Sequence, residues 1–225
     1  MHAWRRHFFY TREVTRTTWK LRFLIVVVII LTVVSTRRLW EAQIAEGLQC
    51  AEDRARSDAI VIENFDPHYL LFERAAALKK AGVAPIVLVP VRSEPQPDML
   101  SPVAKGFAEV MARVAWLDDW QIIPIDEREP ITLNAAVQIR DDLLRRQVKS
   151  VTVVTSGLRS QRAALVNRAV LGDAGVEVRC APVFGPTYTG RWTDTWHGIQ
   201  NVTEEFLKLQ YYRFYVLPFK YGSSS

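Results

Sequence analysis

The segment Ser150–Leu171 reads SVTVVTSGLRSQRAALVNRAVL and joins two patterns. Ser150–Thr155 is rich in β-branched residues, which are typical of a strand. A Ser-Gly turn follows, and Arg159–Leu171 then has the composition and spacing of a helix. A strand that is apolar on both faces and leads directly into a helix predicts a parallel sheet covered by helices on both sides.

The same alternation repeats on either side of this segment. Aliphatic or β-branched runs predict further strands at Ala59–Glu63, Pro85–Val89, Gln121–Ile125 and Val176–Ala181. Helical patterns lie between them at Tyr69–Ala81, Val103–Val114 and Leu133–Arg146, and Thr132 is expected to cap the last of these. The sequence therefore predicts a doubly wound α/β fold, with a mostly parallel sheet of about five strands flanked by helices.

A final helix is expected over Trp196–Val216. Four apolar residues recur at helical spacing and form its expected core face: Ile199, Val202, Phe206 and Leu209. Its charged residues are expected to turn away from the core: Glu204, Glu205 and Lys208. This helix should close the domain.

The formal net charge of +5 lies in the first 22 residues, where six arginines and lysines face a single acid. The remainder of the chain is neutral, so the domain has no electrostatic footprint for nucleic acid, and no such partner is expected. With 49% hydrophobic and 24% charged residues, the composition is that of a globular protein.

An apolar run, Phe23–Val34 (FLIVVVIILTVV), follows the basic tail. With the next two residues it covers about 20 Å, less than a hydrocarbon core of about 30 Å. Extended to Trp19–Trp40 it reaches about 30 Å, with a tryptophan for each membrane interface. We therefore expect one N-terminal transmembrane helix at 19–40, with the lipid bilayer as a partner.

More positive charge precedes the apolar run than follows it, so the positive-inside rule places the tail, residues 1–22, in the cytoplasm. The expected location is the inner membrane, with the domain on the periplasmic side. A cleaved signal peptide and a buried core helix are the alternatives. No Ala-x-Ala cleavage site follows the run, and a soluble core helix rarely has a basic cluster at each end.

Beyond the anchor we expect a polar stem at 41–57, one α/β domain at 58–217 and a short tail at 218–225. The chain has two cysteines, Cys50 in the stem and Cys180 in the last predicted strand. Outside the cytoplasm the two can form a disulfide. The alternative is that Cys180 is simply a small buried side chain.

Polar residues follow the first, third and fourth predicted strands. Ligands bind at the carboxyl ends of the strands in an open parallel sheet, so these residues are candidates for a site. The candidate ligand-binding set is Glu63, Asn64, Asp126, Thr132, Asn134, Thr155, Ser156, Arg159 and Arg162.

The fourth strand offers the most chemistry. Thr155 and Ser156 lead into a helix N-terminus, where free amides and the helix dipole favour an anion. Arg159 and Arg162 are three residues apart and share one face of the first turn. This set predicts a site for a phosphate or carboxylate. The alternative is that Ser156 caps the helix while both arginines are solvated or pair with acids that follow the first and third strands.

Several common kinds of site are missing from the sequence. It has no metal-ligand spacing among its histidines, no Gly-x-Ser-x-Gly elbow and no glycine-rich phosphate loop after the first strand. No metal is expected and no hydrolase triad is indicated. The sequence identifies neither catalytic residues nor a cofactor.

Several short motifs occur in an order that is known from one family. They are Asp58-Ala-Ile-Val-Ile with Arg74, Thr132-Leu133-Asn134-Ala135 after Glu127 and Glu129, Thr155-Ser156 with Arg162-Ala163, and Glu205 with Lys208. In these motifs, from about Ser57 to Tyr212, the chain resembles the SanA/ElyC/YdcF-like family of bacterial envelope domains. The resemblance implies an α/β domain behind a transmembrane helix, with a phosphorylated or nucleotide-like ligand in cell-envelope metabolism.

The chain departs from the family pattern at the expected site. Glu63-Asn64-Phe65 and Pro90-Val91-Arg92 replace glycine-rich strand ends, and Arg159 replaces a histidine. Glycine allows close backbone approach to a ligand and histidine shuttles protons, whereas the residues present do neither. The second hypothesis is therefore a degenerate, non-catalytic member that acts as an accessory or structural subunit of a membrane complex.

Overall fold

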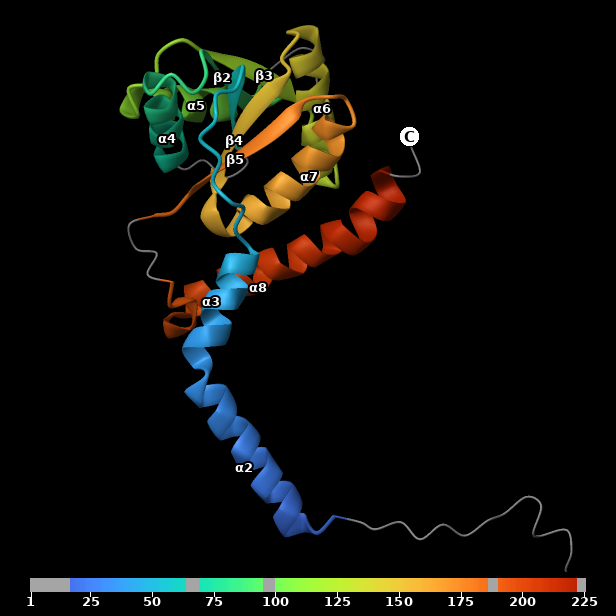
Figure 1. Ribbon diagram of the computed structural model, residues 1–225. Coiled ribbons are helices and arrows are strands. Elements are labelled where there is room, and N and C mark those ends of the chain that lie inside the picture. The colour runs from blue at the N-terminus through green and yellow to red at the C-terminus, as the bar shows by residue number, and fades with distance from the viewer. Residues whose placement is uncertain (1–16, 64–68, 95–99, 186–189, 222–225) are drawn as a thin grey trace, which may run out of the picture. The chain divides into compact units, whose positions relative to one another are not determined.

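The computed structural model describes residues 17–63, 69–94, 100–185 and 190–221 (Figure 1). The chain divides into two compact units, Met1–Trp40 and Glu41–Ser225. The second unit contains the whole of the sheet and all the candidate site residues.

The sheet of the second unit has five strands, and every neighbouring pair is parallel. The strands are β1 (Ala59–Ile62), β2 (Ile86–Arg92), β3 (Trp120–Ile125), β4 (Ser150–Ser156) and β5 (Glu177–Val183). Their order is β3-β2-β1-β4-β5, so the direction of winding reverses between β1 and β4. The predicted α/β class, with a parallel sheet of five strands, is confirmed.

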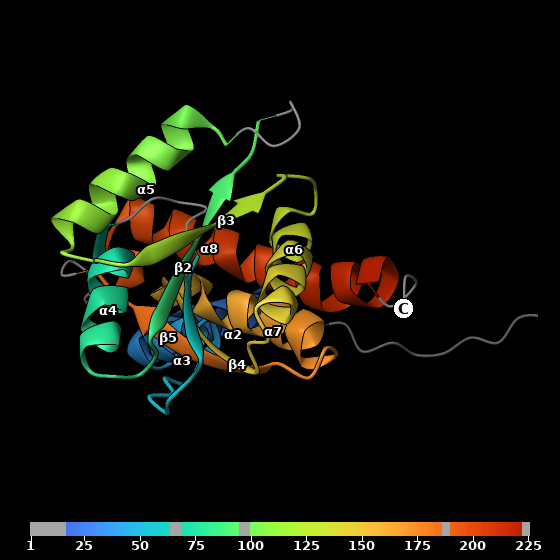
Figure 2. The same ribbon diagram turned by 90° about the horizontal axis from the view of Figure 1, so that it is seen from above.

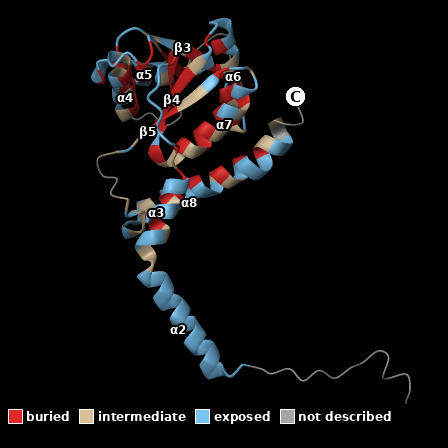
Figure 3. Ribbon diagram, in the orientation of Figure 1, coloured by how far each residue is buried: buried red, intermediate tan, exposed pale blue. Residues whose placement is uncertain are grey.

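Helices cover both faces of this sheet (Figure 2). One face carries α4 (Tyr69–Lys80) and α5 (Pro102–Val114), and the other carries α6 (Ile131–Arg145) and α7 (Ser160–Gly172). Alternation along β1 supplies both cores, since Ile60 packs on the α4 side and Val61 on the α6 side. Figure 3 shows the central strands as buried, which explains why they are apolar throughout.

The start of α6 differs from expectation. The helix begins at Ile131 and its N-cap position is Pro130, which provides no side-chain cap. Asn134 instead secures the preceding loop, because its Nδ2 donates to the carbonyls of Arg128 at 3.1 Å and Pro130 at 3.3 Å. The predicted N-cap role of Thr132 is therefore wrong, and its hydroxyl is available for another partner.

The last helix also differs. It comprises α8 (Trp196–Tyr211), which continues as a π-helix at Tyr212–Tyr221 and so runs past the expected end at Val216. Its buried row is Val202, Glu205, Leu209, Tyr212 and Val216. Glu205 is therefore inside and Phe206 is 44% exposed, the opposite of the predicted arrangement. The hydrophobic pattern misplaced these two residues because a buried carboxylate with a cationic partner has the same sequence pattern as a solvated one.

The segment expected as a polar stem packs on the domain. Leu48 and Cys50 are buried, and Cys50 is joined to Cys180 by a disulfide with the Cα atoms 6.4 Å apart. The Cys50 amide donates to Ser160 Oγ at 2.9 Å, and the Gln161 amide donates to the Leu48 carbonyl at 3.0 Å. Residues from Glu41 onwards therefore belong to the compact unit.

The first unit contains α2 (Trp19–Ser35), in which no side chain is buried. The helix stops at Thr36, and α3 (Arg37–Gly47) begins in a new direction, so 19–40 is not one continuous helix as predicted. The hydroxyls of Thr32 and Thr36 donate to carbonyls four residues earlier, at 2.8 and 2.7 Å, a contact that commonly bends helices. In the described residues no helix taken singly is long and apolar enough to cross a membrane, while α2 and α3 meet that requirement as a pair bent by 62°.

The amino ends of β1 and β4 are joined by Asp58. Its carboxylate accepts from the amides of Lys149 at 2.9 Å and Ser150 at 2.8 Å, and from the Ser150 hydroxyl at 3.0 Å. These bonds, first that from the Lys149 amide, lower the pKa of Asp58 below its usual range. The carboxylate therefore stabilises the fold only while it is ionised.

Asp58→Asn is expected to lower the free energy of unfolding at pH 7 by about 1 kcal/mol, because the exposed site discounts the full value of charged hydrogen bonds. The contribution is present above the ordinary carboxyl pKa of about 4 and is lost as the pH falls through the lowered pKa. Urea denaturation of both proteins from pH 7 to pH 3 should show the difference shrinking with falling pH. A difference that is constant over this range would contradict the role of the charge.

Candidate functional site

The candidate site lies at the carboxyl edge of the sheet between β1 and β4, where the winding reverses. Ligands of open α/β sheets bind in the crevice at such a position. Glu63 directly follows β1, and Thr155 and Ser156 end β4. These residues therefore lie where the topology favours a ligand.

Glu63 is buried and held by β4. Its amide donates to the Val154 carbonyl at 2.9 Å, which extends the ladder beyond β1. The Thr155 hydroxyl, which is fully buried, donates to the Glu63 carboxylate. The carboxylate thus has a fixed position at the base of the crevice.

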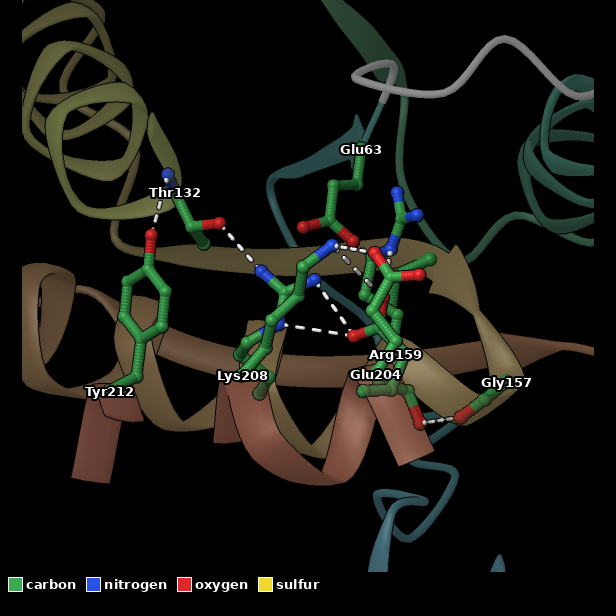
Figure 4. Close-up of polar contacts among 11 residues, drawn as sticks. Glu63, Thr132, Gly157, Arg159, Glu204, Lys208 and Tyr212 are labelled. Atoms are coloured by element: carbon green, nitrogen blue, oxygen red, sulfur yellow. Dashed lines mark hydrogen bonds and ion pairs between the residues drawn. The ribbon is translucent and has the colours of Figure 1, made fainter. Parts of the chain in front are cut away.

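Arg162, in the first turn of α7, is buried and bound on three sides. Its Nε and Nη2 donate to Glu205 Oε2 at 3.2 and 2.9 Å, and its Nη1 donates to Thr132 Oγ1 at 2.7 Å. The guanidinium carbon lies 5.6 Å from the centre of the Tyr212 ring, within cation–π range. The Tyr212 hydroxyl accepts from the Thr132 amide at 3.2 Å, so the four residues form one network (Figure 4).

Two further cations, Arg159 and Lys208, lie beside this network. Arg159 Nε is 3.4 Å from Glu205 Oε1, and Lys208 Nζ is 4.0 Å from the same oxygen. Lys208 also donates to Glu204, and this bond keeps the pKa of Glu204 below its usual range. The Lys208 side chain is 44% exposed and that of Arg159 is 21% exposed, so both remain open to a ligand in part.

A cleft of about 360 Å³ opens over these groups. In Figure 4 the side chains of Glu63, Arg159 and Lys208 converge on it. Its lining residues are Glu63, Glu129, Ile131, Thr132, Arg159, Arg162, Lys208, Tyr211 and Tyr212. A second cleft of about 240 Å³ adjoins it and shares Arg159, with Ser156, Glu204 and Glu205 in its wall.

Other predicted site residues lie elsewhere. Asp126 lies in the loop between β3 and α6, where it pairs with Arg128 at 2.5 Å, and Asn134 lies in the first turn of α6 and bonds to the same loop. Neither residue lines either cleft, although Glu129 and Thr132, which also follow β3, line the larger one. Asn64 falls outside the described residues.

The amides after Ser156 do not form the expected open anion cradle. Gly157 is buried under the ring of Phe184, which leaves no room even for a Cβ atom. The Gln161 amide is used by the Leu48 carbonyl. The helix proper begins only at Ser160, after a 3₁₀ turn at Gly157–Arg159. The positive groups that face the clefts are therefore side chains rather than backbone amides.

Arg162 does not pair with an acid that follows the first or third strand, as the alternative hypothesis supposed. Its partner is Glu205, on the last helix. Tyr211, Tyr212 and Lys208 are further lining residues that the strand-end argument missed, whereas Glu129 follows the third predicted strand. The sequence signal for this helix was the three-residue spacing of Glu205 and Lys208, which places their side chains next to each other on one face.

The larger cleft is lined by side chains of both charges. Three bases and two acids line the larger cleft, so it can hold an anion with polar groups without a large excess of charge. In the residues that the structure describes, no group of three potential ligands could hold a metal ion.

Comparisons with known proteins identify no family for this chain. No family model and no curated protein matches the chain. A solved structure of a universal stress protein in complex with cAMP is similar at 17% sequence identity, with a TM-score of 0.35. The match covers 57% of this chain and 98% of that one.

Proposed function

We propose that this chain is a membrane-anchored α/β domain of the bacterial envelope that binds a phosphorylated or nucleotide-like small molecule. The observation that carries the proposal is the 360 Å³ cleft at the reversal point of the sheet, lined by the cationic ends of Arg159 and Lys208. Tyr211 adds an aromatic wall, 48% exposed, on which a planar or sugar group can pack.

The anchoring part of the proposal is supported by α2 and by the disulfide. α2 contains the uninterrupted apolar run from Phe23 to Leu31, and none of its side chains is buried. A helix with apolar side chains on all faces needs an apolar environment. The Cys50–Cys180 disulfide favours an oxidising compartment for the domain.

Arg159→Ala is expected to weaken binding of a phosphorylated ligand by about tenfold or more, because a charged hydrogen bond is worth roughly 1.5–3 kcal/mol. The side chain is partly exposed and lines both clefts, so its loss should leave the fold largely intact. Calorimetric titration with inorganic phosphate and with nucleoside mono- and diphosphates measures the effect.

Arg168→Ala is the matched control, because Arg168 is an exposed arginine on the same helix as Arg162 and lines neither cleft. It should bind like the wild type. If the wild type binds no phosphorylated compound at millimolar concentration, or if Arg159→Ala binds as well as Arg168→Ala, the site proposal fails.

The topology is tested with single added cysteines. Ser224→Cys is expected to react with a membrane-impermeant maleimide while the inner membrane is intact, because the proposal places that end outside the cytoplasm. Thr15→Cys, in the basic tail, should react only after the inner membrane is permeabilised. The reverse pattern would exclude an extracytoplasmic domain.

A non-catalytic accessory subunit remains the second candidate. It is favoured by the way Glu63 and Arg162, the polar groups nearest the strand ends, are both bound internally. The two candidates differ in two measurable respects. An accessory subunit would co-purify with stoichiometric partner proteins. It would bind no phosphorylated compound, so Arg159→Ala would change no ligand affinity.

A further inference from the structure

Glu63 is a buried carboxylate that has no cationic partner among the described residues. It is 5% exposed, and its side chain accepts a hydrogen bond at Oε2 from the Thr155 hydroxyl. None of the arginines and lysines that the structure describes forms an ion pair with it. Buried charges in proteins are normally paired and hydrogen-bonded, because an uncompensated charge is costly. Oε1 of Glu63 therefore calls for a partner that the described part of the chain does not supply.

The neighbouring buried acid, Glu205, shows how this fold compensates a carboxylate. Glu205 is 8% exposed and accepts two hydrogen bonds from Arg162. Arg159 and Lys208 also lie within ion-pair distance of it, at 3.4 and 4.0 Å. The cations of the cleft thus lie against Glu205, while Glu63 in the wall of the same cleft is left with a neutral hydroxyl.

Glu63 opens into the cleft and not only into the core. It lines the cleft of 360 Å³ and a smaller pocket of about 70 Å³, and Arg159 lines both as well. Figure 4 shows the side chains of Glu63 and Arg159 directed into the same space. A ligand with an anionic group at Arg159 therefore needs only a short linker to reach Glu63.

The smaller pocket favours a charged contact at Glu63. Apart from Glu63, Ser156 and Arg159, its side-chain lining is apolar and consists of Leu70, Leu71 and Val183. Apolar walls keep the local dielectric low, so an interaction between opposite charges is weakened less than in water.

The charges around the site do not suit a simple anion. The ionisable residues that line the clefts of 360 and 240 Å³ are Arg159, Arg162, Lys208, Glu63, Glu129, Glu204 and Glu205. The acids outnumber the bases by one, so a phosphate adds negative charge to a site that is already slightly negative. A cationic group in the same ligand offsets this excess, and Glu63 is the buried acid that can receive it.

We propose that Glu63 determines the specificity of the cleft by binding an ammonium group of the ligand, while the phosphate of the same ligand binds at Arg159 and Lys208. The ligand class is then a phosphate ester with an amine a few bonds from its phosphate. This inference rests on the proposed ligand-binding function and narrows it. A hydroxyl group in place of the amine would give Glu63 a hydrogen bond without a positive charge, so it would compensate the carboxylate less well.

Three matched compounds test the proposal by calorimetric titration of the full chain in detergent micelles. Phosphoethanolamine, 2-hydroxyethyl phosphate and propyl phosphate share a phosphate and a chain length, and end in an ammonium, a hydroxyl and a methyl group. The wild type should bind phosphoethanolamine at least about tenfold more tightly than either of the other two, since a charged hydrogen bond forms only with the ammonium.

Glu63→Gln isolates the charge, because glutamine has nearly the same size and can still accept from the Thr155 hydroxyl. This variant should bind all three compounds with similar affinity. Glu109→Gln, at a half-exposed acid on α5, is the control and should keep the tenfold preference.

The outcomes separate this inference from the proposed function. If the wild type binds the three compounds equally, or binds the hydroxyl compound most tightly, the inference is overturned and the phosphate site stands. If none of the three binds although a nucleotide does, the inference is again overturned alone. Failure of inorganic phosphate and nucleotides as well would overturn both.

The stability of Glu63→Gln gives a second readout that a purely structural carboxylate would not show. Without ligand, the substitution should raise the melting temperature by about 2–4 °C, because it removes an uncompensated buried charge. A residue that is retained for binding at the expense of stability has this signature. A fall in melting temperature would show that the carboxylate serves the fold and would contradict the proposal.

Discussion

Replacing Arg162 with alanine is expected to lower the free energy of unfolding by about 3 kcal/mol, because the buried Glu205 carboxylate loses its hydrogen-bonded partner and keeps only the longer ion pairs to Arg159 and Lys208. Glu205 is 8% exposed and receives two hydrogen bonds from Arg162. Thr132 and the Tyr212 ring lose a contact to the same guanidinium. Urea denaturation followed by circular dichroism measures the loss.

Two controls separate the buried ion pair from a general effect of losing an arginine. Arg168→Ala removes an exposed arginine on α7 and should change stability by less than about 0.5 kcal/mol. The double variant Arg162→Met with Glu205→Met replaces the pair by apolar side chains and should recover most of the loss. If the double variant is no more stable than Arg162→Ala, the cost does not come from an unpaired buried charge.

The stability of Arg162→Ala does not show whether the cleft binds a ligand. Arg162 is needed for the fold whether or not the cleft binds a ligand, because its charge is already neutralised by Glu205. Arg159 is partly exposed and lines both clefts, so its substitution separates the ligand-binding and accessory hypotheses. A stability effect at Arg162 alone therefore supports neither hypothesis over the other.

The fold was predictable because its central strands are apolar on both faces. β1 and β4 are buried between two helical layers, and this burial requires the runs of β-branched residues seen in the sequence. The strand order was not predictable, since the alternation of strands and helices is the same for several orders. That is why Asp126 was grouped with Glu63, although its strand lies at the edge of the sheet.

The site was predictable at the strand ends and unpredictable where it depends on α8. Glu63, Thr155 and Arg162 follow from the rule for parallel sheets, and the structure brings them to one edge. Glu205 and Tyr212 come from a helix about 40 residues away in sequence, and local periodicity treats a charged residue as solvated. A buried ion pair violates that assumption, so pattern analysis placed Glu205 on the wrong side of its helix.

Reducing the Cys50–Cys180 disulfide is expected to lower the free energy of unfolding by about 2–4 kcal/mol, because the bond restricts the unfolded chain. It joins residues 130 apart in sequence, and both cysteines are buried. The sequence has no other cysteine, so reduction has one structural consequence and no rearrangement competes with it. Urea denaturation with and without dithiothreitol measures the difference.

The variant with alanine at both cysteines should match the reduced wild type, because alanine fills the apolar site without adding a polar group. The folded segment should stay in place in both, since the Cys50 amide still donates to Ser160 and the Gln161 amide to Leu48. The loss should then appear mainly through the greater freedom of the unfolded chain. A loss below about 1 kcal/mol in both samples would contradict this account, because closing so long a loop should cost the unfolded chain more entropy than that.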